Sequence, residues 1–197
     1  MRLDFWYEFA STYSYPAAMR IEGLAQARGI SLRWRPFLLG PIFVEQGWRN
    51  SPFNIFPQKG AYMWRDMARI TAALGLEFRK PDPFPQNSLL AARTVLAIPE
   101  ALRPAFSRAV YVAAFGQGLP IAERDILAQL LEKLGLHAST ILEKALSEPV
   151  KARLKAENEE AKRLGIFGAP TFLTEDGEMF WGNDRLEAAI NWERGAI

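Results

Sequence analysis

The chain has 197 residues, 49% of them apolar, which is enough to bury one sizeable core or one core with a helical insert. Its 24 Lys and Arg against 22 Asp and Glu leave a formal net charge of +2 and no basic tract that would favour nucleic acid. No apolar run approaches a membrane span, and Asp4 and Glu8 interrupt the apolar N-terminal stretch, unlike a signal peptide. We therefore expect a cytoplasmic protein with neither a nucleic-acid nor a membrane partner.

The absence of cysteine limits the chemistry that the protein can perform with its own side chains. Disulfides, thiolate metal sites and redox-active thiols are excluded, so any sulfur chemistry must use a bound thiol. The single histidine, His137, lies in a predicted connection between two helices, and we interpret it as a loop residue rather than a member of a catalytic triad. We predict no metal site.

The first forty residues predict a β-α-β unit. Residues 3–9 are rich in aromatic side chains and partly alternate, as in a mostly buried strand. Hydroxyl side chains and a proline within 11–16 favour the start of a helix that ends by Gly29. Residues 30–37 predict a second strand, and this order favours parallel pairing with a right-handed crossover.

The middle of the chain predicts one long loop followed by helices. Glycines and prolines between 38 and 57 indicate an irregular connection. Apolar stripes at helical spacing then predict helices over 63–74, 88–98, 101–115 and 126–134. We interpret these stripes as helix-packing core rather than as cofactor sites.

The last fifty residues return to a mixed pattern. Residues 149–164 predict a charged helix, and we interpret its charged side chains as a face exposed to solvent. Residues 170–174 and 178–181 predict a β-hairpin around a Glu-Asp-Gly turn, followed by a helix over 184–192.

This order of elements predicts an α/β protein with a thioredoxin-like fold and an inserted all-helical domain. We assign residues 1–40 and 150–197 to the discontinuous thioredoxin-like domain and residues 41–149 to the helical insert domain. In such a fold chemistry is expected where the first strand meets the first helix, because the free N–H groups and dipole of the helix stabilise an anion there. Ser11 occupies that position, although a hydroxyl there is also consistent with a simple helix cap.

Four separated motifs resemble one family. The stretch Asp4–Ser11, followed by Tyr13-Ser14-Tyr15, is similar to the opening of the 2-hydroxychromene-2-carboxylate isomerases and kappa-class glutathione transferases of the thioredoxin-fold disulfide-oxidoreductase superfamily. The resemblance covers nearly the whole chain and implies that the family's active serine is Ser11. Thr12 departs from the pattern, because many relatives have proline there.

Two further motifs imply contacts with glutathione as cofactor. Asn50 and Lys59 keep the nine-residue spacing of the asparagine and lysine that hold glutathione in kappa-class enzymes, although both also suit an ordinary loop. An ammonium and an amide are suited to the carboxylates and peptide groups of the tripeptide. Residues 165–172 resemble the family's cis-proline segment, which implies that Ala169, before a cis Pro170, binds glutathione through its backbone.

The motif before the last helix implies a third contact. Residues 181–186 resemble the family's segment in which an aspartate pairs with the free amine of glutathione. This assigns the role to Asp184, with Asn183 and Arg185 beside it. The alternative is that Asp184 is the N-cap of the helix.

Candidate substrate contacts are less specific. Residues 84–88 resemble the substrate-side loop of the isomerases, which makes Asn87 a candidate for a carboxylate or hydroxyl of the substrate or, alternatively, a helix cap. Tyr13 and Trp64 are candidates for an aromatic wall. Other aromatic side chains could share this role in part, although most are expected in the core: Trp6, Phe9, Phe37, Phe43 and Trp48.

The resemblance implies a glutathione-dependent isomerase. Such an enzyme would interconvert 2-hydroxychromene-2-carboxylate and trans-o-hydroxybenzylidenepyruvate, or a related aromatic enone, by reversible thiolate addition in aromatic hydrocarbon catabolism. The resemblance also implies a homodimer. The alternatives are a kappa-class-like glutathione transferase and a non-catalytic binding scaffold of the same fold.

Overall fold

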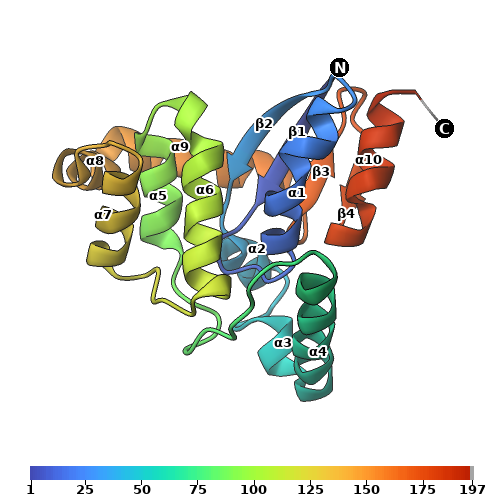
Figure 1. The fold of residues 1–197 in the computed structure, drawn as a ribbon, viewed down its shortest axis with the longest axis horizontal. Coiled ribbons are helices and arrows are strands. Elements are labelled where there is room, and N and C mark those ends of the chain that lie inside the picture. The colour runs from blue at the N-terminus through green and yellow to red at the C-terminus, as the bar shows by residue number, and fades with distance from the viewer. Residues whose placement is uncertain (196–197) are drawn as a thin grey trace.

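A four-stranded mixed sheet forms the centre of the protein, whose computed structural model describes residues 1–195 (Figure 1). The strands, in the spatial order β2-β1-β3-β4, are β1 (Arg2–Tyr7), β2 (Ser31–Pro36), β3 (Thr171–Leu173) and β4 (Met179–Trp181). The β1–β2 pair is parallel, and the other two pairs are antiparallel. The predicted β-α-β unit and C-terminal hairpin are confirmed, with each strand one or two residues shorter than predicted.

Both faces of β1 are buried, as its aromatic sequence predicts. Phe5 and Tyr7 point into the main core under α1 (Ser14–Gln26) and α10 (Leu186–Glu193). Phe5 stacks on Phe172 of β3 with ring centroids 5.5 Å apart. Trp6 points to the opposite face, where a smaller core contains Phe37, Ile42, Ala161 and Ile166. The strand therefore joins two apolar layers and fixes the position of its own C-terminal end.

Eight further helices lie between β2 and β3. They are α2 (Leu39–Glu45), α3 (Pro52–Ile55), α4 (Pro57–Ala73), α5 (Leu89–Ala97), α6 (Arg103–Tyr111), α7 (Arg124–Lys133), α8 (Ala138–Ala145) and α9 (Glu148–Arg163). Short 3-10 turns occupy Glu100–Leu102 and Asn183–Arg185, and a π-helical turn occupies Val112–Gly116. In Figure 1, α5 to α8 gather beside β2, whereas α3 and α4 project from the end of the molecule where α2 lies.

The prediction of an irregular connection over 38–57 is wrong in part. The segment contains α2 and α3, and α4 begins at Pro57, earlier than the predicted residue 63. The prolines that suggested a loop stand in the first turns of these helices, where the missing N–H has no partner to lose. Ser51 caps α3 by accepting the N–H of Phe53 at 3.3 Å.

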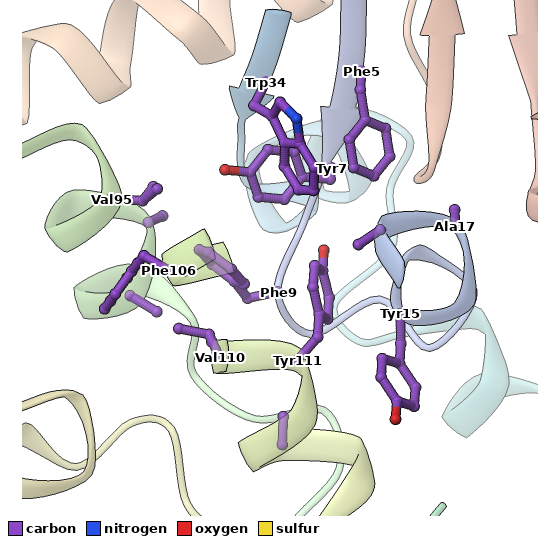
Figure 2. Packing of buried hydrophobic residues seen from close by; sticks show 14 of the residues in the cluster. Phe5, Tyr7, Phe9, Tyr15, Ala17, Trp34, Val95, Phe106, Val110 and Tyr111 are labelled. Atoms are coloured by element: carbon purple, nitrogen blue, oxygen red, sulfur yellow. The ribbon is translucent and has the colours of Figure 1, made fainter. Parts of the chain in front are cut away.

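The main core runs without interruption from the sheet into the helical insert. Figure 2 shows Tyr7 and Phe9, at the end of β1, beside Phe106 and Tyr111 of α6. The rings of Phe9 and Tyr111 lie 5.3 Å apart. The division at residues 40 and 150 stays a prediction. Within residues 1–195, no helix combines the length and the apolar character needed to cross a membrane.

Candidate active site

A cavity of about 950 Å³ opens where β1 ends. Its walls come from five segments that are distant in the sequence: the turn after β1, the stretch from α2 to the first turn of α4, the loop before α5, the segment before β3, and the end of β4. This volume lies within the range of pockets that bind small organic molecules. The cavity is therefore the candidate active site.

Ser11 lines this cavity, three residues before α1 begins. Its backbone N–H donates to the carbonyl of Glu8 at 3.0 Å, and its Oγ donates to the carbonyl of Ala169 at 2.9 Å. Ala169 also lines the cavity, and its peptide bond to Pro170 is cis, in agreement with the prediction. The sheet thus brings together two residues that are 158 positions apart in the sequence.

Two hydrogen bonds hold the turn between Ser11 and α1 in place. The Thr12 side chain is buried, and its hydroxyl donates to Sδ of Met63 in α4 at 3.1 Å. The N–H of Tyr15 donates to the carbonyl of Thr12 at 3.2 Å. Thr12 therefore holds this turn in place, and the positive end of the α1 dipole lies next to Ser11.

Asn50 and Lys59 reach the same cavity from the α2–α4 segment. The Oδ1 of Asn50 accepts the N–H of Ser51 at 2.7 Å and the Nδ2 amide of Asn54 at 3.2 Å. The Nζ of Lys59 lies 4.8 Å from the ring centroid of Phe56. Arg49, which the sequence analysis did not single out, also lines the cavity. Two cationic side chains at the rim suit a ligand that carries carboxylates.

Asp184, Asn183 and Arg185 do not line the cavity with Ser11. The Asp184 side chain is 73% exposed and its Oδ2 lies 3.5 Å from Nη1 of Arg185. Asn183 is buried, and its Oδ1 accepts the Nη2 of Arg20 at 3.0 Å. Asp184 lies inside a 3-10 turn rather than at the N-cap of α10. The binding roles assigned to these three residues stay predictions.

The three substrate candidates lie in different surroundings. Tyr13 lines the cavity, and its hydroxyl donates to Oδ2 of Asp66 at 3.0 Å. Asn87 also lines the cavity, while its Oδ1 accepts the N–H of Leu89 at 3.0 Å at the start of α5. Trp64 lies outside the lining and packs edge-on against Phe84, which does line the cavity, with ring centroids 4.7 Å apart. Trp64 thus supports the aromatic wall from behind.

Aromatic side chains also line the cavity from the segments before β3 and at the end of β4. Phe167 and Trp181 line the cavity, are about half exposed, and contact each other edge-on at 4.9 Å. A Cβ atom at Gly168 would lie 2.3 Å from Nε1 of Trp181, so only glycine permits this packing. From α2 and the loop that follows it, Phe43 and Trp48 also line the cavity. The spacing of Phe167 and Trp181 in the sequence does not indicate that these two side chains are in contact.

Glu8 is a further lining residue that the sequence analysis did not assign to the site. Its side chain is buried, accepts the N–H of Ala10 at 2.8 Å through Oε2, and accepts the Ser88 hydroxyl through Oε1. Burial raises the pKa of Glu8 from its ordinary value of 4.5 to about 7, an increase that the hydrogen bonds from Ser88 and Ala10 partly offset. The sequence feature that could have indicated Glu8 as a site residue is its position, an acidic side chain directly after a strand rich in aromatic residues.

No metal-binding cluster accompanies these side chains. Among residues 1–195, no group of three or more histidine, aspartate or glutamate side chains lies close enough together to hold a metal ion. His137 precedes α8 and is not part of the cavity lining. The polar groups available in the cavity are therefore hydroxyls, amides, backbone carbonyls, two cations and one buried acid.

Comparison with known proteins places the chain among relatives of nearly equal length. It is 30% identical over 200 residues to glutathione S-transferase kappa 1 of Homo sapiens, covering 94% of this chain and 87% of that protein. It is 28% identical over 187 residues to 2-hydroxychromene-2-carboxylate isomerase of Sphingobium xenophagum, covering 94% of each. A solved structure of a 2-hydroxychromene-2-carboxylate isomerase superposes with a TM-score of 0.88 at 28% identity, covering 98% of this chain and 95% of that one.

These relatives confirm the resemblance inferred from the four motifs, and the superposition confirms the thioredoxin-like fold with added helices. The family model of the DSBA-like thioredoxin domain matches residues 2–190, which is almost the full length of the chain. With the serine at the strand–helix junction, the cis proline beside it and this match, the chain belongs to the DSBA-like thioredoxin domain family.

Proposed function

We propose that the protein is a glutathione-dependent isomerase that interconverts 2-hydroxychromene-2-carboxylate and trans-o-hydroxybenzylidenepyruvate, or a related aromatic enone, in aromatic hydrocarbon catabolism. The observation that carries this proposal is the contact between Ser11 and Ala169 in a cavity with cationic and aromatic walls, in a chain without cysteine. The isomerases found among the relatives, which match over nearly the full chain, support it.

The cavity has groups that fit glutathione. The carbonyl of Ala169 is available to the peptide N–H of a ligand once Ser11 releases it, as a cis-proline segment would require. Lys59, Asn50 and Arg49 are placed to meet carboxylates and peptide groups. Asp184 is the proposed partner of the free amine. It follows the lining residue Trp181 by three positions, so a ligand would have to extend past that side chain to reach it.

When bound, glutathione would supply a thiolate that adds reversibly to the conjugated carbon of the substrate and makes a double bond rotatable. Ser11 would turn its hydroxyl from Ala169 to the sulfur, and the N-terminus of α1 would add a favourable field. A free thiol titrates near pH 8.5, so lowering its pKa by about two units requires about 2.7 kcal/mol of differential stabilisation. One charge-assisted hydrogen bond together with a helix dipole can supply this amount.

The aromatic walls would hold the substrate. Tyr13, Phe43, Trp48 and Phe84 line the cavity and offer flat apolar surfaces for an aromatic ring. Asn87 lies in the same cavity and is the proposed donor to a carboxylate or hydroxyl of the substrate. The 950 Å³ volume has room for a tripeptide and a bicyclic aromatic molecule in contact.

Two alternatives to the isomerase would use the same binding site. A kappa-class-like glutathione transferase is favoured by the 30% identity to the human transferase, and it would consume glutathione whereas an isomerase would return it. A non-catalytic binding scaffold would not activate the thiol at all. We further propose that the protein acts in the cytoplasm, where glutathione is kept reduced, and as a homodimer.

The first test is calorimetric titration with glutathione, followed by an isomerisation assay with glutathione measured before and after turnover. We expect binding in the micromolar to low-millimolar range, weakened about tenfold by either Lys59→Ala or Asp184→Ala. We also expect isomerisation without loss of glutathione. Consumption of glutathione with each turnover would favour the transferase, and no binding would leave only the scaffold.

A further inference from the structure

Among the described residues, Glu8 is the only acidic side chain that lines the candidate active site. It lies three positions before Ser11, and its backbone carbonyl accepts the N–H of Ser11 at 3.0 Å. Its side chain is 5% exposed and joins two walls of the cavity, because it binds the Ala10 N–H on one side and the Ser88 hydroxyl on the other. Neither contact requires a charge on the carboxyl group.

The groups that face Glu8 leave its charge uncompensated. Tyr111 of α6 donates its hydroxyl to the Glu8 carbonyl at 2.9 Å, and burial holds the pKa of that tyrosine well above its ordinary value, so it stays neutral. The hydroxyl of Tyr13 is bonded to Asp66 instead. The cations Arg49 and Lys59 line the same cavity, and within residues 1–195 neither makes an ion pair with Glu8. Desolvation therefore dominates and raises the pKa of Glu8 to about 7, so near neutral pH the carboxyl group can both accept a proton and return it.

We propose that Glu8 holds the proton that leaves the bound thiol when the sulfur at Ser11 becomes a thiolate. This inference rests on the proposed function. The Glu8 carboxylate accepts the proton, the S–H bond breaks with its electron pair left on sulfur, and an O–H bond forms on the carboxyl group. The same proton returns to sulfur before the thiol leaves. One negative charge is exchanged for another, so the cavity never holds two anions close together.

A purely structural Glu8 would behave differently. If the carboxyl group kept one protonation state throughout, every thiolate formed in the site would send a proton to the buffer. If Glu8 takes that proton, the buffer receives almost none above the pKa of Glu8. Below that pKa the carboxyl is already protonated, and about one proton is released per bound thiol. The count of released protons thus separates the two cases without measuring turnover.

The experiment is calorimetric titration with glutathione at about pH 7.5 in buffers of different ionisation enthalpy, which yields the number of protons exchanged. The ultraviolet absorbance of the thiolate is measured on the same complex. We expect thiolate with close to no proton released from the unaltered protein, and thiolate with close to one proton released from Glu8→Gln. S-methylglutathione, which has no thiol proton, should give close to none with both proteins.

A second variant covers the case in which Glu8→Gln does not fold. Ser88→Ala keeps the carboxyl group but removes a hydrogen bond that lowers the pKa of Glu8. In the unaltered protein, proton release should rise as the pH falls through about 7. In Ser88→Ala the same rise should occur at higher pH.

Each outcome decides the question. Thiolate accompanied by close to one released proton in the unaltered protein at about pH 7.5 overturns the role of Glu8 but leaves the proposed function intact. A Ser88→Ala curve that does not move, or a Glu8→Gln complex with thiolate and no released proton, places the proton elsewhere and also overturns it. Absence of thiolate in the unaltered protein overturns the proposed function and this inference together.

Discussion

At the scale of single residues, the hydroxyl of Ser11 has two possible acceptors. In the structure it donates to the carbonyl of Ala169, and in the proposed complex it would donate to sulfur. This exchange costs little, because one neutral hydrogen bond is replaced by a stronger bond to an anion and the freed carbonyl gains a ligand N–H. Ser11 is thus suited to stabilise a charge that forms only after binding.

We expect Ser11→Ala to lower kcat by about 10- to 100-fold and to change the affinity for glutathione much less, because the lost hydrogen bond matters most once sulfur is charged. Steady-state kinetics and calorimetric titration of the variant measure the two quantities. Ser147→Ala is the matched control, since its hydroxyl also donates to a backbone carbonyl, that of Lys144, but outside the cavity lining. Full turnover by Ser11→Ala would contradict this mechanism.

At the scale of elements, close packing between α3 and α4 positions Lys59. Gly60 follows Lys59 in α4 and is buried against α3, where a Cβ atom would lie 2.3 Å from the backbone carbonyl oxygen of Phe53. That oxygen belongs to the main chain and cannot move aside as a side chain could. The close approach of the two helices therefore requires glycine at this point.

We expect Gly60→Ala to lower the free energy of unfolding by about 1 to 3 kcal/mol and to weaken glutathione binding, because the helices must separate beside Lys59. Gly23→Ala is the control. Gly23 lies inside α1, and beyond the neighbouring helix backbone no atom lies within 4 Å of its added Cβ, so alanine should be neutral or stabilise by up to about 1 kcal/mol. Urea unfolding of both variants tests the pair, and equal stabilities would contradict the close contact.

Much of the element order could be predicted because it depends on local patterns. The aromatic run of β1, the hairpin turn after β3 and the apolar stripes of the helices are all visible in short windows. The helices within 38–57 were missed because proline was taken to mark a loop, whereas Pro41, Pro52 and Pro57 stand in first turns. The position of a proline decides its effect, because proline is tolerated in the first turn of a helix but interrupts the helix interior.

The candidate site was predictable only in part. The motifs led to Ser11, Asn50, Lys59 and Ala169, which the fold brings to one cavity. The same reasoning did not indicate that Asn183, Asp184 and Arg185 lie outside the cavity lining. It also missed the contact of Phe167 with Trp181 and the burial of Glu8 under Ser88. These features depend on contacts between distant segments, which no local pattern encodes.

At the scale of the whole molecule, Glu8 couples folding to pH. Its pKa is about 7 in the folded protein against an ordinary value of 4.5, so between these values the folded state binds more protons than the unfolded state. The free energy of unfolding therefore falls as the pH rises through this window. This raised pKa makes the contribution of Glu8 to the free energy of unfolding on the order of 3 kcal/mol at low pH.

We expect the unaltered protein to lose about 2 to 3 kcal/mol more stability than Glu8→Gln when the pH is raised from about 5 to about 8. Urea unfolding curves at several pH values provide the measurement. Comparing the two proteins at each pH removes the contributions of all other titrating groups. Parallel stability profiles would show that Glu8 titrates normally in the folded protein.

Two separate parts of the chain form the cavity. The turn after β1 and the segment before β3 belong to the sheet and hold Ser11 and Ala169, whereas α2 and the loop before α5 lie in the stretch between β2 and β3. Substitutions in that stretch can reshape the aromatic wall without displacing the sheet residues. Under the proposed function, substitutions in that stretch would change which aromatic compounds fit the cavity, while Ser11 and Ala169 would keep their positions beside the bound thiol.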